Sequence, residues 1–261
     1  MEPKDMKITP RWNKSKEDVW DERFVSLEDG KRAKKTFLFR VTAWRCVAAS
    51  VALLVACTFF AYAYTLTRQN GRNEAASFSL PDGSRVSLNT DSELRYKPYW
   101  WFIDRYAEMK GEACFEVKTG KEFTVASANN AVRVLGTAFN VLAREEVYQV
   151  TCLTGKIEVF AGKEKALLAA NMRLTKTAGQ LRIDEDVDAK QSVSWRENGF
   201  SFNGVPLSHV IAEIERYYHI RITSESGLEY FYTGNFSKDK EPEEILEIIG
   251  KPFGIHFSIS K

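Results

Sequence analysis

The longest uninterrupted apolar pattern in the chain runs from residue 46 to residue 66. These 21 residues carry no charge, and as a helix they would span about 32 Å, which matches the hydrocarbon core of a bilayer. A helix buried in a soluble core would show a polar stripe, and this segment has none. We therefore predict a retained transmembrane helix over 46–66. The alternative is a cleaved signal peptide, but signal peptides do not usually carry 45 residues ahead of their apolar region.

The charges on either side of this segment predict its orientation. Six cations closely precede the run and two closely follow it, namely Lys31, Arg32, Lys34, Lys35, Arg40 and Arg45 before it and Arg68 and Arg72 after it. The positive-inside rule then places the N-terminus in the cytoplasm and the larger C-terminal part on the opposite side of the membrane. The formal net charge of the whole chain is only +2, which argues against a general nucleic-acid binder.

Residues 1–45 form a short head with one amphipathic pattern. Ser15 to Asp18 is typical of a helix N-cap, and the sequence from Glu28 to Gly30 predicts the helix end. Between them one apolar stripe is formed by Trp20, Phe24 and Leu27, at i, i+4 and i+7. A head this small cannot bury the stripe in a core of its own. The stripe either lies on the membrane surface or docks in a groove of a cytoplasmic partner, and both interpretations stay open.

The pattern changes twice after the apolar segment. Residues 67–76 are polar without a hydrophobic period, which predicts a linker. Residues 77–190 then alternate in short runs, as in Ala113, Phe115 and Val117, with turn signals about every ten residues. This pattern predicts an all-β domain, which could be a sandwich, a barrel or a solenoid.

Residues 195–261 predict a small α+β domain made of two β-α-β units. Pro206 and Pro242 each occupy a position that opens a helix, and each predicted helix is flanked by strand-like alternation. Shifting the sequence by 35 residues superimposes the apolar positions of the two units, which are Val210, Ile211, Ile214, Ile220 and Ile222 on Ile245, Leu246, Ile249, Ile255 and Phe257. Together the parts predict a mixed fold with one transmembrane helix, an all-β domain and this C-terminal domain.

Residues with catalytic or metal-binding chemistry form no recognisable motif. The three histidines have no histidine or cysteine partner at zinc-site spacing, so we predict neither a metal nor a cofactor. Asp184 and Asp186 could in principle be an acid pair of a transferase, although such short acidic matches are common in loops. A disulfide between Cys114 and Cys152 is possible but not favoured, because the alternation puts Cys152 on an apolar face and Cys114 on the same face as Glu116. We predict that the protein is not an enzyme.

Four separated motifs follow one another in the β region. They are Leu80-Pro81-Asp82-Gly83-Ser84, Gly111-Glu112-Ala113-Cys114-Phe115-Glu116-Val117, Val134-Leu135-Gly136-Thr137-Ala138-Phe139-Asn140-Val141 and Gly155-Lys156-Ile157-Glu158-Val159. Together they resemble the FecR family of single-pass anti-sigma factors. The region from Phe200 to Ile259 is similar to the family's C-terminal domain and to the short β-α-β domain of secretins and TonB-dependent receptors. The resemblance singles out Pro81, Asp82, Gly83, Gly111, Glu112, Phe115, Gly136, Thr137, Phe139, Asn140 and Gly155.

The resemblance implies a signal transducer of the bacterial inner membrane with a cytoplasmic head and a periplasmic body. The signalling domain of an outer-membrane TonB-dependent receptor would contact the body. The head would bind an extracytoplasmic-function sigma factor through Trp20, Phe24 and Leu27, without direct nucleic-acid contact. Two other classes remain open, namely a membrane-anchored periplasmic β scaffold for envelope transport and a type II membrane enzyme that would use Asp184 and Asp186.

Overall fold

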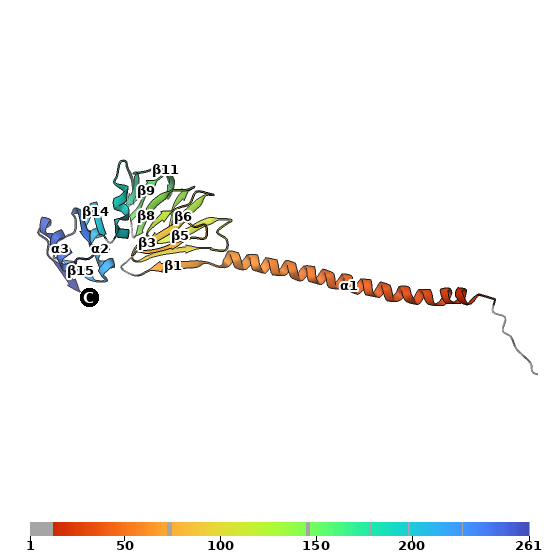
Figure 1. Ribbon diagram of the computed structural model, residues 1–261. Coiled ribbons are helices and arrows are strands. Elements are labelled where there is room, and N and C mark those ends of the chain that lie inside the picture. The colour runs from red at the N-terminus through yellow and green to blue at the C-terminus, as the bar shows by residue number, and fades with distance from the viewer. Residues whose placement is uncertain are drawn as a thin grey trace, which may run out of the picture. The chain divides into compact units, whose positions relative to one another are not determined.

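The computed structural model describes residues 13–71, 75–144, 147–177, 179–197, 199–225 and 227–260, and it leaves out the side chains of residues 24–43. The chain divides after Phe60 into two compact units. The first unit contains most of helix α1 (Lys16–Ala63), and the second contains the remaining elements (Figure 1).

Helix α1 begins with the predicted cap. The Ser15 hydroxyl accepts the Asp18 backbone N–H at 3.1 Å, and the Asp18 carboxylate accepts the Ser15 backbone N–H at 3.2 Å, which is the reciprocal pattern of a capping box. The predicted helix end at Gly30 is wrong, because α1 continues through it to Ala63. A single glycine inside a helix costs only about 1 kcal/mol, and the good helix formers Lys31 to Lys35 follow it.

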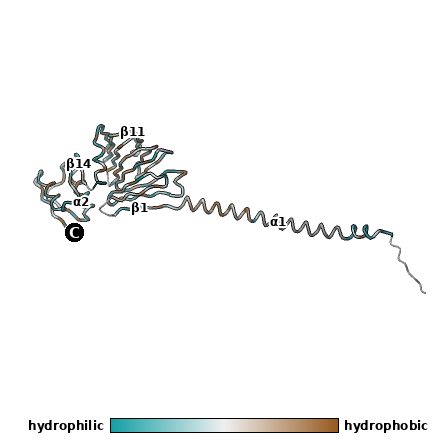
Figure 2. Tube along the Cα trace, viewed as in Figure 1, coloured by the Kyte–Doolittle hydropathy of each residue, from teal (hydrophilic) through white to brown (hydrophobic). Residues whose placement is uncertain are grey.

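The C-terminal part of α1 is the one helix in the described residues that is long and apolar enough to cross a membrane. It runs from Trp44 to Ala63 with a mean hydropathy of 2.2, and none of it is buried inside the protein. Figure 2 shows hydrophilic residues at the start of α1 and hydrophobic ones toward its end. The apolar run predicted as helix to residue 66 is helical only to Ala63, and Leu66 already begins a strand.

Residues expected to be a linker contribute that strand, β1 (Leu66–Asn70). It pairs antiparallel with β4 (Ser92–Tyr96), and the Asn70 side chain donates to the Leu88 carbonyl at 3.0 Å. The sequence shows no apolar alternation here, because β1 is exposed along most of its length and only Asn70 is fully buried.

A 13-stranded sheet forms the body that follows α1. Its remaining strands are β2 (Ala76–Ser79), β3 (Arg85–Leu88), β5 (Arg105–Glu116), β6 (Phe123–Ser127), β7 (Asn130–Val134), β8 (Ala138–Arg144), β9 (Val147–Thr154), β10 (Lys156–Ala161), β11 (Glu164–Ala169), β12 (Arg173–Thr177) and β13 (Gln180–Asp184). The sheet divides at β5, whose first half pairs with β4 and β6 and whose second half pairs with β3 and β8. Among the described residues of this sheet, β5 and β6 alone pair in parallel. This excludes the solenoid alternative, because solenoid coils pair in parallel throughout.

Both halves of the divided sheet contribute side chains to one hydrophobic core. Its largest fully buried members are Trp101, Phe115, Phe123 and Phe139, and the rings of Phe115 and Phe139 stack at 5.1 Å. Burying each aromatic ring contributes about 1.5–3 kcal/mol. The alternation noticed at Ala113, Phe115 and Val117 is confirmed, since all three side chains are buried in this core.

The C-terminal region is a small α+β domain with its own core. A 3-10 segment, η1 (Ala189–Glu197), leads into it, and its elements are β14 (Gly199–Pro206), α2 (Leu207–Tyr218), β15 (Arg221–Ser224), β16 (Phe231–Ser237), α3 (Pro242–Gly250), η2 (Lys251–Phe253) and β17 (Phe257–Ser260). Strand β14 pairs with β16, and β15 pairs with β17. The strands and helices follow the order β-α-β twice, and the repeated apolar positions of both helices are buried in this core.

Candidate functional site

The motif around residues 80–84 forms a tight turn, and Arg105 connects this turn to the loop that follows β5. The Asp82 carboxylate accepts hydrogen bonds from the backbone N–H of Ser84 at 3.0 Å and from the Ser84 hydroxyl at 2.8 Å, and it pairs with the Arg105 guanidinium. The same guanidinium donates to the carbonyl of Lys121 at 2.6 Å. Burial opposes ionisation of Asp82, but the bonds from Ser84 and the charge of Arg105 outweigh it, so its pKa lies below the ordinary value. Gly83 follows Pro81 and Asp82 in this turn with φ +79°, a conformation that glycine adopts without strain.

The motif around residues 136–140 begins at the bend between β7 and β8. The Thr137 carbonyl accepts the Val117 backbone N–H at 2.9 Å, which ties this bend to the end of β5. The Gly155 turn, between β9 and β10, lies directly against the Thr137 side chain, because a Cβ added at Gly155 would be 2.7 Å from the Thr137 methyl carbon. A Cβ added at Gly136 would lie 2.6 Å from the Thr119 Cα. These motif residues therefore fix the close approach of neighbouring turns.

The residues Glu112 and Asn140, which lie in different motifs, meet in a buried polar cluster. The two oxygens of the Glu112 carboxylate accept the side-chain amides of Asn89 at 2.7 Å and Asn140 at 2.8 Å. The Asn89 amide also donates to Glu213 on α2 at 3.2 Å. A carboxylate of the sheet and a carboxylate of the C-terminal domain thus share one amide donor. We call this cluster the polar junction.

Three cations complete the polar junction. Arg216 pairs with Glu213 at 2.9 Å, and Arg144 donates to the Thr90 carbonyl at 2.5 Å in the wall of the cluster. Lys238 is only 6% exposed, and its ammonium lies 4.6 Å from the centre of the Tyr217 ring. These cations decide which carboxylate of the junction carries charge.

The two carboxylates of the junction differ in their affinity for a proton. Burial raises the pKa of Glu112, and the nearby Glu213 raises it further, although Arg144 and the two amides oppose this. Burial also disfavours the charged form of Glu213, but Arg144, Arg216 and Lys238 outweigh it and lower its pKa. As the pH falls, Glu112 therefore takes up a proton before Glu213 does.

A second polar contact joins η1 to the sheet. Arg196 pairs with Glu116 at 2.8 Å and donates to the Cys114 sulfur at 3.4 Å. Cys114 and Cys152 are both buried free thiols, so the disulfide that the sequence left open is not formed. Burial raises the pKa of each thiol to about 11, which keeps both in the unreactive protonated form.

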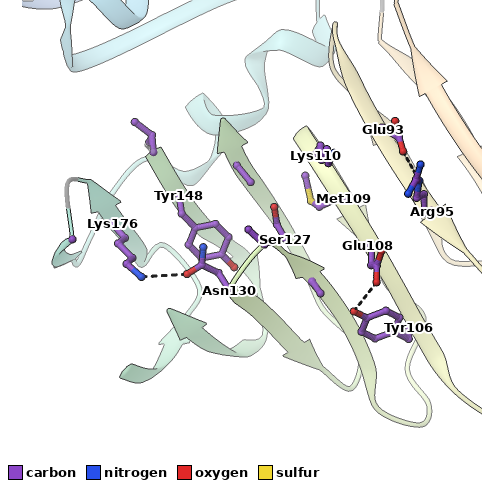
Figure 3. Close-up of a pocket in the computed structure, with 15 residues that line it drawn as sticks. Glu93, Arg95, Tyr106, Glu108, Met109, Lys110, Ser127, Asn130, Tyr148 and Lys176 are labelled. Atoms are coloured by element: carbon purple, nitrogen blue, oxygen red, sulfur yellow. Dashed lines mark hydrogen bonds and ion pairs between the residues drawn. The ribbon is translucent and has the colours of Figure 1, made fainter. Parts of the chain in front are cut away.

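A cleft of about 500 Å³ opens on the sheet, and residues of several strands from β4 and β5 to β9 and β12 line it (Figure 3). The Tyr106 hydroxyl donates to Glu108 at 3.2 Å, and the Lys176 ammonium donates to Asn130 at 3.4 Å. These polar side chains bond to one another instead of converging on a common point. Among the described residues, no group of three or more histidine, cysteine, aspartate or glutamate side chains is placed to hold a metal ion.

Sequence reasoning anticipated only part of the polar junction. It selected Glu112 and Asn140 through the motifs, but it missed Asn89, Arg144 and Glu213, which no local pattern marks. The predicted sigma-factor stripe can be placed only at Trp20, which lies on α1 with 62% of its side chain exposed. The side chains of Phe24 and Leu27 lie outside the described residues.

Comparisons with known proteins agree with this architecture. The family model "FecR protein" matches residues 67–158, and the model "FecR, C-terminal" matches residues 199–261. Two crystal structures, each of a candidate anti-sigma factor from Parabacteroides distasonis ATCC 8503, have similar folds. One has a TM-score of 0.69 at 30% identity and covers 74% of this chain and 93% of its own. The other has a TM-score of 0.70 at 28% identity and covers 75% and 99%. No curated protein matches the chain.

Proposed function

The chain belongs to the FecR family of anti-sigma factors, and on that basis we propose that it relays a signal from an outer-membrane TonB-dependent receptor to an extracytoplasmic-function sigma factor. In this scheme α1 crosses the bacterial inner membrane once, with the head in the cytoplasm and the body in the periplasm. In the same scheme the chain acts as a regulator and not as an enzyme.

The observation that carries this proposal is the apolar segment Trp44–Ala63, which lies between a charged helical head and a folded body. Six cations precede the segment between residues 31 and 45, namely Lys31, Arg32, Lys34, Lys35, Arg40 and Arg45. Only Arg68 and Arg72 follow it closely, so the positive-inside rule favours a cytoplasmic N-terminus. A reporter active only in the cytoplasm should work when fused before Lys31 and fail when fused after Gly71. The reverse result would overturn the proposed orientation.

Sigma-factor binding is assigned to the stripe Trp20, Phe24 and Leu27. Support comes from Trp20, a large and mostly exposed aromatic side chain of the kind that anchors protein interfaces. Trp20→Ala should weaken capture of the sigma factor by the full chain by about 2 kcal/mol, or about thirtyfold. Asp21→Ala, at an exposed neighbour on the same helix, is the control and should leave capture unchanged. Equal capture by both variants would favour the membrane-surface interpretation of the stripe.

Signal reception is assigned to the C-terminal domain, whose two-stranded sheets have edges that could accept a strand from the receptor's signalling domain. Phe231 at the start of β16 supports this, because 70% of its side chain is exposed. Phe231→Asp should weaken binding of the purified signalling domain about tenfold, whereas Leu167→Asp, at a similarly exposed position on β11, should not. If both variants bind the signalling domain equally well, the receptor must contact a surface other than the one at Phe231.

A further inference from the structure

The loop between β4 and β5, residues 97–104, carries an exposed apolar cluster. Tyr99, Phe102 and Ile103 are 62%, 68% and 64% exposed. Large apolar side chains that gather on a surface usually mark a contact with a partner or a membrane. We call these three side chains the loop tip.

The loop is rigidly built, so its exposed side chains do not result from disorder. The ring of the adjacent Trp101 is fully buried, 5.4 Å from the ring of Phe123 in the sheet core. The backbone N–H groups of Ile103 and Asp104 donate to the Trp100 carbonyl at 3.0 and 3.1 Å, which closes a compact turn. The loop tip is therefore presented in a fixed conformation without further loss of chain entropy.

This loop touches the residues at which the apolar helix ends. Tyr62 lies in the last turn of α1, and its ring meets the ring of Trp100 edge-on at 5.4 Å. Tyr64, just beyond the helix, has its ring 5.3 Å from that of Tyr99. The Lys97 ammonium lies 3.7 Å from the centre of the Tyr62 ring. The loop therefore packs against the residues at which the apolar segment Trp44–Ala63 ends.

The chemistry of this cluster fits a membrane–water interface. Tyrosine and tryptophan rings are enriched at the level of the lipid headgroups, with their apolar parts toward the acyl chains. The ammonium groups of Lys97 and of Lys121, which donates to the Phe102 carbonyl at 3.3 Å, can bind lipid phosphates beside the rings.

We propose that the loop tip inserts into the outer leaflet of the membrane that α1 spans and thereby docks the β body on the lipid surface. The occupant is the phospholipid bilayer itself and not a protein partner. The inference rests on the proposed membrane anchoring by α1, and it adds a second membrane contact, which is made by the folded body.

Photo-crosslinking of the full chain tests this contact. A benzophenone amino acid replaces Phe102 or Ile103, and the protein is reconstituted in nanodiscs of phosphatidylethanolamine and phosphatidylglycerol. The same probe at Leu54, in the apolar segment, reports anchoring, and at Leu167, exposed on β11, it reports background. Thermal unfolding of each variant checks that the exposed replacement leaves the body folded.

We expect mass spectrometry to find phospholipid adducts at positions 102 and 103 in yields close to that at 54, with only background at 167. Adducts at 54 without adducts at 102 and 103 would overturn the loop contact and leave the anchoring intact. Absence of lipid adducts at position 54 would overturn the membrane anchoring by α1 and the loop contact together. Equal lipid yields at 102 and 167, or a protein adduct at 102 in intact cells, would also refute insertion of the loop tip.

Discussion

The polar junction predicts that its two carboxylates respond differently to the same substitution. Glu213 is ionised and surrounded by Arg144, Arg216 and Lys238, so replacing it leaves cations without their counter-charge. Removing one partner of a buried pair costs about 3–5 kcal/mol. The side chains of Glu213 and Arg216 are each still 16% exposed to solvent, which screens their charges. We therefore expect Glu213→Ala to lower the free energy of unfolding by about 3 kcal/mol, at the lower end of this range. Glu213→Gln retains the shape and should cost about 2 kcal/mol.

Glu112→Gln should cost less, about 0.5–1 kcal/mol, because burial and Glu213 already favour the neutral form of this side chain. The assay is urea unfolding of the purified full chain in detergent, followed by circular dichroism and tryptophan fluorescence. Coincidence of the two probes justifies a two-state free energy. Glu247→Gln, at an exposed position of α3, is the matched control and should stay within about 0.5 kcal/mol of the wild type.

The pH dependence gives the same reasoning a second test. A glutamate whose folded pKa is raised binds more protons in the folded state than in the unfolded state just above its ordinary value of 4.5. Stability must then fall as pH rises through this window, up to the folded pKa of Glu112. The lowered pKa of Glu213 has the opposite effect, a loss of stability as pH falls below 4.5. Glu112→Gln should therefore abolish the loss of stability that occurs as the pH rises above 4.5, and it should leave the loss at lower pH unchanged.

A loss of stability in Glu112→Gln as large as that in Glu213→Gln would refute the different roles assigned to the two carboxylates. Equal unfolding free energies for both variants and the Glu247→Gln control would also refute these roles, since the buried polar contacts of the junction would then contribute nothing to stability. A wild-type profile that rises steadily between pH 4.5 and neutrality, and is unchanged by Glu112→Gln, would contradict the assignment of the proton to Glu112.

Three further predictions concern single positions of the β body. Gly111→Ala should lower the unfolding free energy by more than about 2 kcal/mol in urea titrations, because φ is +88° and the new Cβ would lie 2.7 Å from a neighbouring backbone carbonyl oxygen. Arg105→Gln should cost about 3 kcal/mol in the same assay and raise the pKa of Asp82 in an NMR titration, since it removes the buried counter-charge. Cys114 and Cys152 should resist iodoacetamide in the folded chain and react fully in urea, as mass spectrometry of their peptides would record.

The sequence alone determined the features that depend on local periodicity. An uncharged run long enough to cross a bilayer identifies the apolar segment of α1 wherever the rest of the chain lies. Alternation of period two marked the buried faces of the strands, and the 35-residue repeat marked both helices of the C-terminal domain. Each of these signals needs only one face of one element to be apolar, and that property is visible in a short window of sequence.

Features that depend on pairing between distant segments were decided by the tertiary structure. Strand β1 is polar and became a strand only because the edge of β4 was available to it. Gly30 did not end α1, because a glycine only weakens a helix that good helix formers continue. Trp101 and the loop tip are adjacent in sequence, yet the core accepts the first and leaves the second exposed.

The polar junction shows most clearly how the tertiary structure brings distant residues together. Asn89 and Glu213 are 124 positions apart and meet only when the C-terminal domain packs beside the sheet. Polar side chains carry no periodic signal, because their burial is tolerated only where specific partners satisfy them. The motifs could select Glu112 and Asn140 but could not say which groups they bind. Those partners, and the proton affinity that they impose on Glu112, arise only from the packing of the folded chain.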